Sequence, residues 1–578
     1  MLDFSSPRQI KRVYALALFG VALSRFLNLG FLDLQAWDEA LYAVRSVGIL
    51  QFGGIFDQTS FSIGGLYSSL HPPLYVWLTS VSFLVFGVTE FAARFFSAVF
   101  GGLTLMVIYK IGKEIHSSKV GFIAAMLFGL NPFVSFYARQ GQFDTTLVFF
   151  LSLSVLYLLR YESRGKLSFA LVGGLAIGAA LMTKLFVGCG ILLAYFFWKA
   201  ATHEDKEPLW KPIFVSLSMA LLVCAPWYVY MTIARGSGNP LFLLDASAVI
   251  ERSVAGVEGN VKPLEVFYYV NQFFVLFPLG VIWFILGFHR VFKHRDHAWI
   301  LLAIWFAVFF VVFTLMRTKL AVYLLPMLVP ASLLAAYSLV AVGNGLVSKM
   351  ITAISLAITG IAFLWSSNQS WRDLTKAFAV DLFHVRVPAG SEIIAYLPFL
   401  VILCCVVFIS YALYRKEDYV RLNLFMPSII LVPAFVTCFY SIAAVDQFEY
   451  KDGARDLADF IAERQPALLL VAGFDRNPQL TFYLDGADIG WRDDVEVRRL
   501  KPPTERSQLR GWLSQQARDL PSDALVIVEK DKFIRYEWVT AAELIPSDFS
   551  LVFESRRYAV FQRTPLSGLA QLMRRPPP

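Results

Sequence analysis

The sequence predicts an all-α polytopic membrane domain over residues 1–445, followed by a smaller soluble α/β domain over residues 446–578. Of the 578 residues, 57% are hydrophobic and only 16% are charged, and the mean hydropathy is +0.59. Soluble globular domains carry more charge and are less apolar, so these values indicate a multi-span membrane protein. The long apolar runs end near residue 445, and the composition beyond is that of an ordinary soluble domain.

Apolar runs of about 20 residues span a bilayer as a helix, and thirteen such runs occur here. They lie near residues 12–31, 94–112, 120–136, 145–161, 168–183, 185–199, 213–232, 265–288, 298–316, 320–343, 348–366, 394–414 and 425–443. A further run, residues 71–88, is short and is interrupted by Pro72, Pro73 and Gly87. Since proline breaks a continuous helix, we expect amphipathic pieces in the membrane interface there.

The distribution of Lys and Arg orients the chain, because cytoplasmic loops collect positive charge. Most basic clusters fall on one side only if residues 71–88 do not cross the membrane. We therefore expect two external loops, 32–93 and 233–264, and an external tail. Arg8, Lys11 and Arg12 precede the first apolar run, and no small-residue cleavage site follows it, which indicates a retained helix rather than a signal peptide.

The net charge of +8 arises in these loop clusters, so it indicates topology and lipid headgroups rather than nucleic acid. In the tail the pattern predicts helices over 451–464 and 479–484 and strands over 467–472, 524–528 and 550–561. The five cysteines lie within apolar runs without CxxC spacing, and we expect small core residues at Cys189, Cys224, Cys404, Cys405 and Cys438.

Two acidic sites fall on the predicted external face. Asp38 and Glu39 follow the first helix, and Asp144 opens the fourth span after a polar break. Each site could equally be a helix start, since carboxylates are favourable near a helix N-terminus. The occurrence of both on one face favours a functional site over two separate helix starts.

Several cations share this face. Lys184 lies between two apolar runs with little room for a loop, and Arg317 and Lys319 lie in the turn between the ninth and tenth spans. Ionisable residues at such depth are costly and usually face a cavity or an anion. His71 and Tyr323 lie on the same face, where interfacial aromatic rings without a role are also common.

Carboxylates beside cations at a membrane face suit transfer from a phosphate leaving group. The cations would neutralise the charge that develops on the departing phosphate, and a carboxylate would activate or orient the acceptor. These charges suit the leaving phosphate and leave the transferred group open.

Six motifs occur in order along the chain: WDEALY at 37–42, HPPLYVWL at 71–78, FGVTEFAAR at 86–94, YAR at 137–139 leading to Asp144, TK at 183–184 and TKLAVYLLP at 318–326. With these motifs the chain resembles GT-C superfamily glycosyltransferases of the protein O-mannosyltransferase type. It is most similar to the branch of bacterial lipid A aminoarabinose transferases. The tail is similar to that branch at residues 450–452 and 479–484.

The resemblance implies a GT-C membrane domain with external interfacial helices, in an enzyme of the bacterial inner membrane. The enzyme would take a sugar, such as 4-amino-4-deoxy-L-arabinose, from a polyprenyl-phosphate carrier and transfer it with inversion to lipid A or a related envelope glycolipid. The active site and the tail would lie on the periplasmic side, and we expect a monomer.

The resemblance also assigns residues. Asp38 would be the principal catalytic carboxylate, Asp144 the second, and Glu39 either a further catalytic group or a support for its neighbour. The residues expected to bind substrate are His71, Arg94, Arg139, Lys184, Arg317, Lys319 and Tyr323, with Lys184, Arg317, Lys319 and Tyr323 around the carrier phosphate or the lipid acceptor.

One motif departs from the aminoarabinose transferases, which carry an acidic residue and a Lys before the proline pair. Here the residues are Leu70 and His71, as in the mannosyltransferases. A protein hydroxyl as the acceptor therefore stays open. The loop 233–264 contains no histidine, so we assign no metal ligands and leave a divalent metal as an open requirement.

The role of Asp38 depends on the acceptor. A hydroxyl must lose its proton, which calls for a general base, whereas a phosphate with a second pKa near about 6 is already an anion and needs only orientation. A third alternative, a lipid-linked sugar transporter, would place ionisable residues near the bilayer midplane and show repeat symmetry. The charges here gather at one face, and the sequence shows no convincing repeat.

Overall fold

The chain divides into two compact units. Unit 1 comprises Met1–Leu29, Leu70–Leu78 and Arg94–Val445, and unit 2 comprises Gly30–Ser69, Thr79–Ala93 and Asp446–Pro578. The computed structural model describes residues 7–27, 29–30, 33–35, 38–59, 71–202, 210–234, 247, 250, 267–341, 453–472, 478–483, 496–500, 512–530, 548–555 and 557–564. The predicted spans at 348–366, 394–414 and 425–443, and most of the loop 233–264, lie outside these residues.

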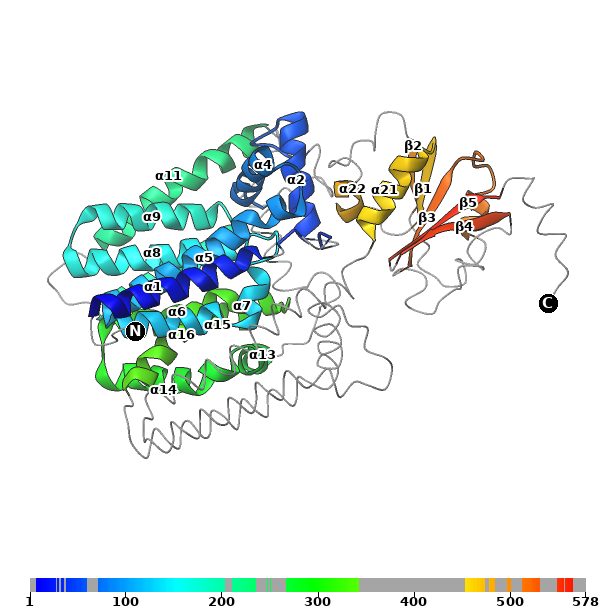
Figure 1. Cartoon of the computed structure of the whole chain (residues 1–578). Coiled ribbons are helices and arrows are strands. Elements are labelled where there is room, and N and C mark those ends of the chain that lie inside the picture. The colour runs from blue at the N-terminus through cyan, green and yellow to red at the C-terminus, as the bar shows by residue number, and fades with distance from the viewer. Residues whose placement is uncertain are drawn as a thin grey trace, which may run out of the picture. The chain divides into compact units, whose positions relative to one another are not determined.

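Unit 1 is helical (Figure 1). Its elements are α1 (Pro7–Leu23), η1 (Ser24–Phe26), α6 (Ser118–Gly129), α7 (Pro132–Tyr137), α8 (Asp144–Arg164), α9 (Leu167–Leu181), α10 (Leu185–Thr202), α11 (Trp210–Ala234), α13 (Tyr268–Leu276), α14 (Pro278–His294), α15 (His297–Leu315), η2 (Ala321–Leu324) and α16 (Leu325–Ala341). Helices α4 (Leu74–Phe86) and α5 (Glu90–Ile115) contribute residues to both units.

Five of the described segments are long and apolar enough to cross a membrane: α5, α8, α11, α15 and the continuous segment Ala321–Ala341. The expectation of a polytopic all-α domain is confirmed to this extent, and the number of thirteen spans stays a prediction. Proline divides two of the predicted spans into shorter helices. The run 120–136 breaks where Asn131 caps α7 and Pro132 takes its first turn, and the run 265–288 breaks at Pro278, which begins α14.

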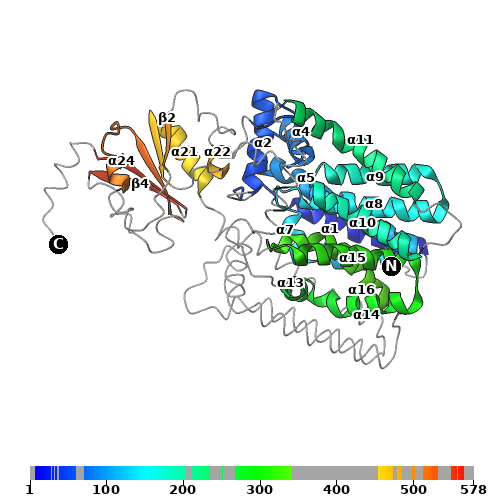
Figure 2. The same ribbon diagram turned by 180° about the vertical axis from the view of Figure 1, so that it is seen from behind.

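Glycine allows close helix packing in unit 1. A Cβ on Gly121 of α6 would lie 2.2 Å from the carbonyl oxygen of Tyr109 on α5, and a Cβ on Gly287 of α14 would lie 2.2 Å from that of Leu334 on α16. Small residues of this kind let helix backbones approach in membranes. Helix α16 packs against α6, α14 and α15, while α9 packs between α8 and α11 (Figures 1 and 2).

Basic residues form ion pairs at one end of this bundle. Arg160 and Arg164, near the end of α8, pair with Glu114 of α5 at 3.4 and 2.5 Å. Lys199 of α10 pairs with Glu162 of α8 at 2.7 Å. Because α8 begins at Asp144 and α10 begins directly after Lys184, these two candidate residues lie at the opposite end of the two helices.

Cys224 is buried, as predicted, but Cys189 is exposed. The expectation of a core residue is therefore wrong for Cys189. The flanking glycines pack closely inside the bundle, since a Cβ on Gly188 would meet Leu181 and one on Gly190 would meet Phe309, and Cys189 between them lies on the outer surface of α10.

Unit 2 contains a five-stranded sheet of order β2-β1-β3-β5-β4. Its strands are β1 (Leu468–Ala472), β2 (Glu496–Leu500), β3 (Leu525–Glu529), β4 (Phe549–Glu554) and β5 (Tyr558–Arg563), and its helices are α21 (Ala454–Arg464), α22 (Pro478–Tyr483) and α24 (Trp512–Gln516). Strand β1 is parallel to β2 and β3, and β5 is antiparallel to β3 and β4. The predicted helices and strands are present, with the run 550–561 forming a hairpin, whereas β2 and α24 were not predicted.

Both faces of β1 are covered by helices. Successive side chains along a strand point to opposite faces of the sheet, so neighbouring residues of β1 report on the two faces. Leu468 and Leu470 of β1 join a cluster with Leu513 of α24. Leu469 of β1 belongs to a second cluster with Leu457 of α21. Helices therefore lie on both sides of β1, which explains why all five residues of this strand are buried and form a continuous apolar run.

The remainder of unit 2 comes from the predicted external loop. Helix α2 (Asp38–Phe52) packs against α22, and Leu34, Ala40, Val44 and Phe83 form one buried cluster with Phe482 of the tail. The predicted boundary at residue 446 therefore describes only part of this unit, since most of the loop 32–93 groups with the tail. The structure adds a long-range interface that apolar runs alone do not reveal.

Candidate active site

Lys184 lies at the junction between α9 and α10. Its Nζ is 4.9 Å from the ring centroid of Phe143 and 4.9 Å from that of Tyr323. Its backbone N–H donates to the carbonyl of Ala180 at 2.9 Å, and Thr183 Oγ1 donates to Ala179 at 2.8 Å. These bonds close the end of α9 and hold the ammonium group between two aromatic faces, which attract a cation.

Asp144 and His71 lie beside this lysine. Asp144 is the first residue of α8, where the helix dipole favours a carboxylate, and it interacts electrostatically with Lys184. The His71 ring lies 5.6 Å from that of Phe143. Residues His71, Phe143, Asp144, Lys184 and Tyr323 are called the lysine cluster below. Four of them were predicted from separate motifs, and the structure brings them together in unit 1.

Backbone contacts support the lysine cluster. The Leu74 N–H donates to the carbonyl of Met182 at 3.2 Å, so the start of α4 is tied to the turn before Lys184. The Ser97 hydroxyl of α5 donates to the carbonyl of Gln142 at 2.9 Å. The Ser97 and Tyr75 hydroxyl oxygens are 3.0 Å apart and share a second hydrogen bond. These bonds link α4 and α5 to the turn that carries Phe143 and Asp144.

Lys319 has a different environment from Lys184. Its Nζ donates to the carbonyls of Phe313 and Thr314 at 3.0 and 2.6 Å and lies 5.3 Å from the Tyr269 ring. The carbonyls in the last turn of a helix lack intrahelical partners, so Lys319 caps the C-terminus of α15. Arg317, two residues earlier, is exposed in the same turn.

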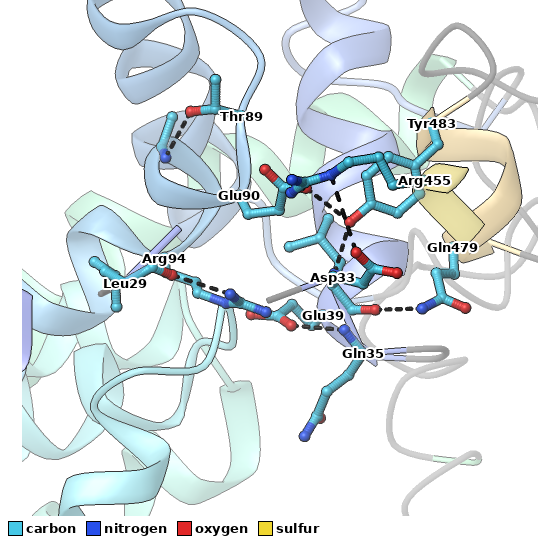
Figure 3. Close-up of polar contacts among 12 residues, drawn as sticks. Leu29, Asp33, Gln35, Glu39, Thr89, Glu90, Arg94, Arg455, Gln479 and Tyr483 are labelled. Carbon is cyan, nitrogen blue, oxygen red and sulfur yellow. Dashed lines mark hydrogen bonds and ion pairs between the residues drawn. The ribbon is translucent and has the colours of Figure 1, made fainter. Parts of the chain in front are cut away.

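The buried arginines Arg94 and Arg139 hold the backbone after α1. Arg139 donates to the carbonyls of Ser24, Arg25 and Leu27 at 3.4, 3.2 and 2.6 Å. Arg94 donates to the carbonyl of Leu29 at 3.0 Å (Figure 3). These bonds satisfy carbonyls at a helix end, and the predicted contact of either arginine with substrate stays a prediction.

Asp38 and Glu39 belong to unit 2, in the first turn of α2. Asp38 is exposed, whereas Glu39 is fully buried. Glu39 Oε2 accepts the N–H of Gln35 at 2.7 Å (Figure 3). Glu39 therefore supports the segment that leads into α2, and Asp38 presents the accessible carboxylate.

The sequence did not single out Phe143 or Tyr269. Phe143 directly precedes Asp144, and an aromatic residue next to a candidate carboxylate is the signal that would have pointed to it. Among the described residues, no group of three or more His, Cys, Asp or Glu side chains could hold a metal ion.

Comparison with known proteins supports the interpretation of these motifs. Residues 70–230 match the family described as dolichyl-phosphate-mannose-protein mannosyltransferase. An undecaprenyl phosphate-alpha-4-amino-4-deoxy-L-arabinose arabinosyl transferase of Pseudomonas savastanoi is 27% identical over 364 residues, which cover 61% of this chain and 66% of that protein. An Aquifex aeolicus protein without an assigned function is 23% identical, over 54% of this chain and 61% of its own length. The chain thus spans less than two thirds of these relatives.

Solved structures show the same fold. ArnT from Cupriavidus metallidurans, bound to undecaprenyl phosphate, has a TM-score of 0.64 at 17% identity and covers 95% of this chain and 97% of its own. The archaeal oligosaccharyltransferase AglB from Archaeoglobus fulgidus has a TM-score of 0.51 at 13% identity, over 91% of this chain and 71% of its own. The predicted resemblance is confirmed: the chain is similar in motifs and fold to GT-C glycosyltransferases of the protein O-mannosyltransferase type, with aminoarabinose transferases among its relatives.

Proposed function

We propose that the chain is an inverting glycosyltransferase that moves a sugar from a polyprenyl-phosphate carrier to lipid A or a related envelope glycolipid. It acts in the bacterial inner membrane, with the site and the α/β tail on the periplasmic side. The observation that carries this proposal is the lysine cluster, in which the Lys184 ammonium group lies over the rings of Phe143 and Tyr323, next to Asp144 at the start of α8. The similarity to ArnT supports a lipid-linked donor.

Lys184 suits the phosphate of the carrier. An ammonium group has three N–H donors, and the rings of Phe143 and Tyr323 hold it by attraction to their faces. Those donors can therefore bind phosphate oxygens. Charge that develops on the phosphate as it departs is stabilised by a cation already fixed in place.

The transfer forms a bond between the acceptor oxygen and the anomeric carbon of the sugar. The bond from that carbon to the carrier phosphate breaks, and the phosphate keeps the electron pair. Attack from the side opposite the phosphate inverts the configuration. With a hydroxyl acceptor, Asp38 takes the proton; with a phosphate acceptor, Asp38 orients an existing anion. Asp144, the first residue of α8, lies close enough to Lys184 to interact with it electrostatically and would help to keep the ammonium group in place.

Charge-neutral variants of the two carboxylates test the proposal. In membranes supplied with polyprenyl-phosphate-linked sugars, we expect Asp38→Asn and Asp144→Asn each to lose sugar transfer to envelope lipid. A matched control is Asp296→Asn, which changes the residue before α15. Full activity of both site variants would reject the assigned residues, and a wild-type protein that transfers no sugar would reject the function.

A protein hydroxyl is the alternative acceptor. It is favoured by the mannosyltransferase family match over residues 70–230 and by His71 before Pro72 and Pro73. Mass spectrometry of envelope lipids and proteins from a deletion strain separates the two acceptors. Loss of a lipid modification supports the first acceptor, and loss of a glycopeptide supports the second.

A further inference from the structure

The segment before Asp38 is bound by the tail of the chain. Leu34 is fully buried, and both of its backbone hydrogen-bonding groups have side-chain partners in α22. The Leu34 N–H donates to the hydroxyl of Tyr483 at 2.9 Å, and Gln479 Nε2 donates to the Leu34 carbonyl at 2.7 Å. Residues four apart share one face of a helix, so a single face of α22 holds both groups. This arrangement is called the Leu34 clamp.

Further hydrogen bonds orient the two clamp side chains. The Tyr483 hydroxyl donates to Glu90 Oε1 at 2.9 Å, which leaves its oxygen directed at the Leu34 N–H. Gln479 Oε1 accepts from the Tyr558 hydroxyl of β5 at 3.2 Å, so the amide nitrogen is directed at the Leu34 carbonyl. The clamp is therefore anchored to the sheet through Gln479 and to the start of α5 through Tyr483.

Charged groups reinforce this interface. Arg455 of α21 donates to Glu90 and lies 4.0 Å from Asp33. Figure 3 shows Arg455, Glu90 and Tyr483 converging next to Asp33. Asp33 and Glu90 are buried, where an opposite charge is needed to offset the loss of water.

The clamp is connected to the first turn of α2. Gln35, next to Leu34, donates its N–H to Glu39, and Leu34 packs in the same cluster as Ala40 and Phe482. Asp38 lies between these anchored positions in the sequence. A shift of Leu34 would therefore move the start of α2 and the carboxylate that begins it.

We propose that Gln479 and Tyr483 are positioning residues for sugar transfer, which hold the Asp38 carboxylate in place through the backbone of Leu34. The inference rests on the proposed function and assigns the α/β tail a part in the reaction. It predicts that loss of the clamp lowers kcat, because small displacements of a reacting group cost up to about 100-fold in rate. KM for the lipid-linked sugar should change little, since the hydrogen bonds of both side chains go to Leu34, Glu90 and Tyr558 within the protein.

The kinetic experiment uses the full chain in membranes or detergent. Tyr483→Phe removes the hydroxyl and keeps the ring, and Gln479→Met removes both polar atoms of the amide. We expect kcat to fall by about 10- to 100-fold in each variant. Loss of a buried hydrogen bond also costs about 1–3 kcal/mol of stability, so both variants are assayed well below their thermal unfolding midpoints. Arg464→Gln is the matched control in the tail, because it breaks an exposed 2.7 Å bond to Gln562 and should keep wild-type kcat.

A double-mutant cycle separates positioning from general loss of structure. If Tyr483 acts through Asp38, Tyr483→Phe has no further effect on the residual activity of Asp38→Asn. Wild-type kcat in Tyr483→Phe and Gln479→Met would overturn the proposal, and so would multiplicative losses in the double variant.

Amide hydrogen exchange tests the clamp without reference to catalysis. Exchange over residues 33–35 should be slow in the wild type and faster in Tyr483→Phe, but unchanged in Arg464→Gln. Equal exchange in all three proteins would overturn the clamp. If the wild type transfers no sugar, the proposed function fails, and the exchange measurement still decides whether the tail fixes this segment.

Discussion

Replacement of Lys184 by Met tests the central assignment of the candidate site. The side chain keeps its approximate length and loses its charge. If the ammonium binds the carrier phosphate, the lost charge-assisted hydrogen bond is worth about 1.5–3 kcal/mol. At about 1.36 kcal/mol for each factor of ten, kcat/KM should fall by about 10- to 150-fold.

Stability should respond much less to this substitution. Two cation–π contacts at 4.9 Å are lost, each worth about 0.5–1 kcal/mol at an accessible site. The partly buried cation that they held is removed as well, which offsets the loss. We therefore expect the thermal unfolding midpoint of Lys184→Met to stay close to that of the wild type.

The assay is sugar transfer from a polyprenyl-phosphate donor at several donor concentrations, which gives kcat and KM separately. Lys199→Met is the matched control, because Lys199 lies near the far end of α10, the helix that begins directly after Lys184. Lys199 lies 5.6 Å from the ring of Trp198 and pairs with Glu162. The transfer rate of Lys199→Met should equal that of the wild type. Wild-type kcat/KM in Lys184→Met, or an equal loss in Lys199→Met, would refute the assignment.

Three further predictions follow from the packing and charge of the chain. Lys319→Met removes the ammonium group that caps the last carbonyls of α15. The free energy of unfolding, measured by chemical denaturation, should fall by about 1–3 kcal/mol. An unchanged free energy of unfolding would contradict the capping role. Gly121→Ala should destabilise by about 1–3 kcal/mol through overpacking, whereas Gly20→Ala, with nothing within 4 Å of the added Cβ, should not. Burial lowers the pKa of Arg455, but the hydrogen bond and charge of Glu90 have the larger effect, so the net pKa is raised. A group with a raised pKa loses its stabilising contribution only when the pH rises towards that pKa, which for an arginine is strongly alkaline. The titration of Arg455 should therefore cause no change in the protease resistance of the tail between about pH 7 and pH 9.

The candidate site residues that could be predicted from the sequence are those that interrupt an apolar run. Lys184 and Asp144 were identifiable because charge within or beside a membrane span is costly, and the structure places them in one cluster. Phe143 is one of 53 phenylalanines, and its place directly before Asp144 is the one sequence signal for it; the contact of its ring with Lys184 is visible only in the structure. Lys319 was predicted to bind substrate, and this stays a prediction. Its hydrogen bonds to the last carbonyls of α15 could not be predicted, because they depend on the conformation of a turn that no periodic pattern reveals.

In the tail, too, continuous apolar runs were predictable and long-range contacts were not. Strands β1 and β3 were predictable because every residue in them is buried, which gives continuous apolar runs. Strand β2 has the sequence EVRRL and, among the described strands, pairs with β1 alone at the edge of the sheet. Its charged residues interrupt the apolar pattern by which a strand is recognised in a sequence. The partners of Gln479 and Tyr483 lie more than 400 residues away at Leu34, beyond the reach of any local pattern.

The Leu34 clamp also constrains the order in which the chain can assemble. Tyr483 follows Leu34 by 449 residues, and at about 5–20 residues per second the ribosome needs about 20–90 s to supply it. During that time every intervening helix is synthesised while Leu34 lacks both of its side-chain partners. Because contacts of large sequence separation form late, the loop around α2 should reach its final conformation only after α22 has been translated, so under the proposed function a new molecule could not become active before that point.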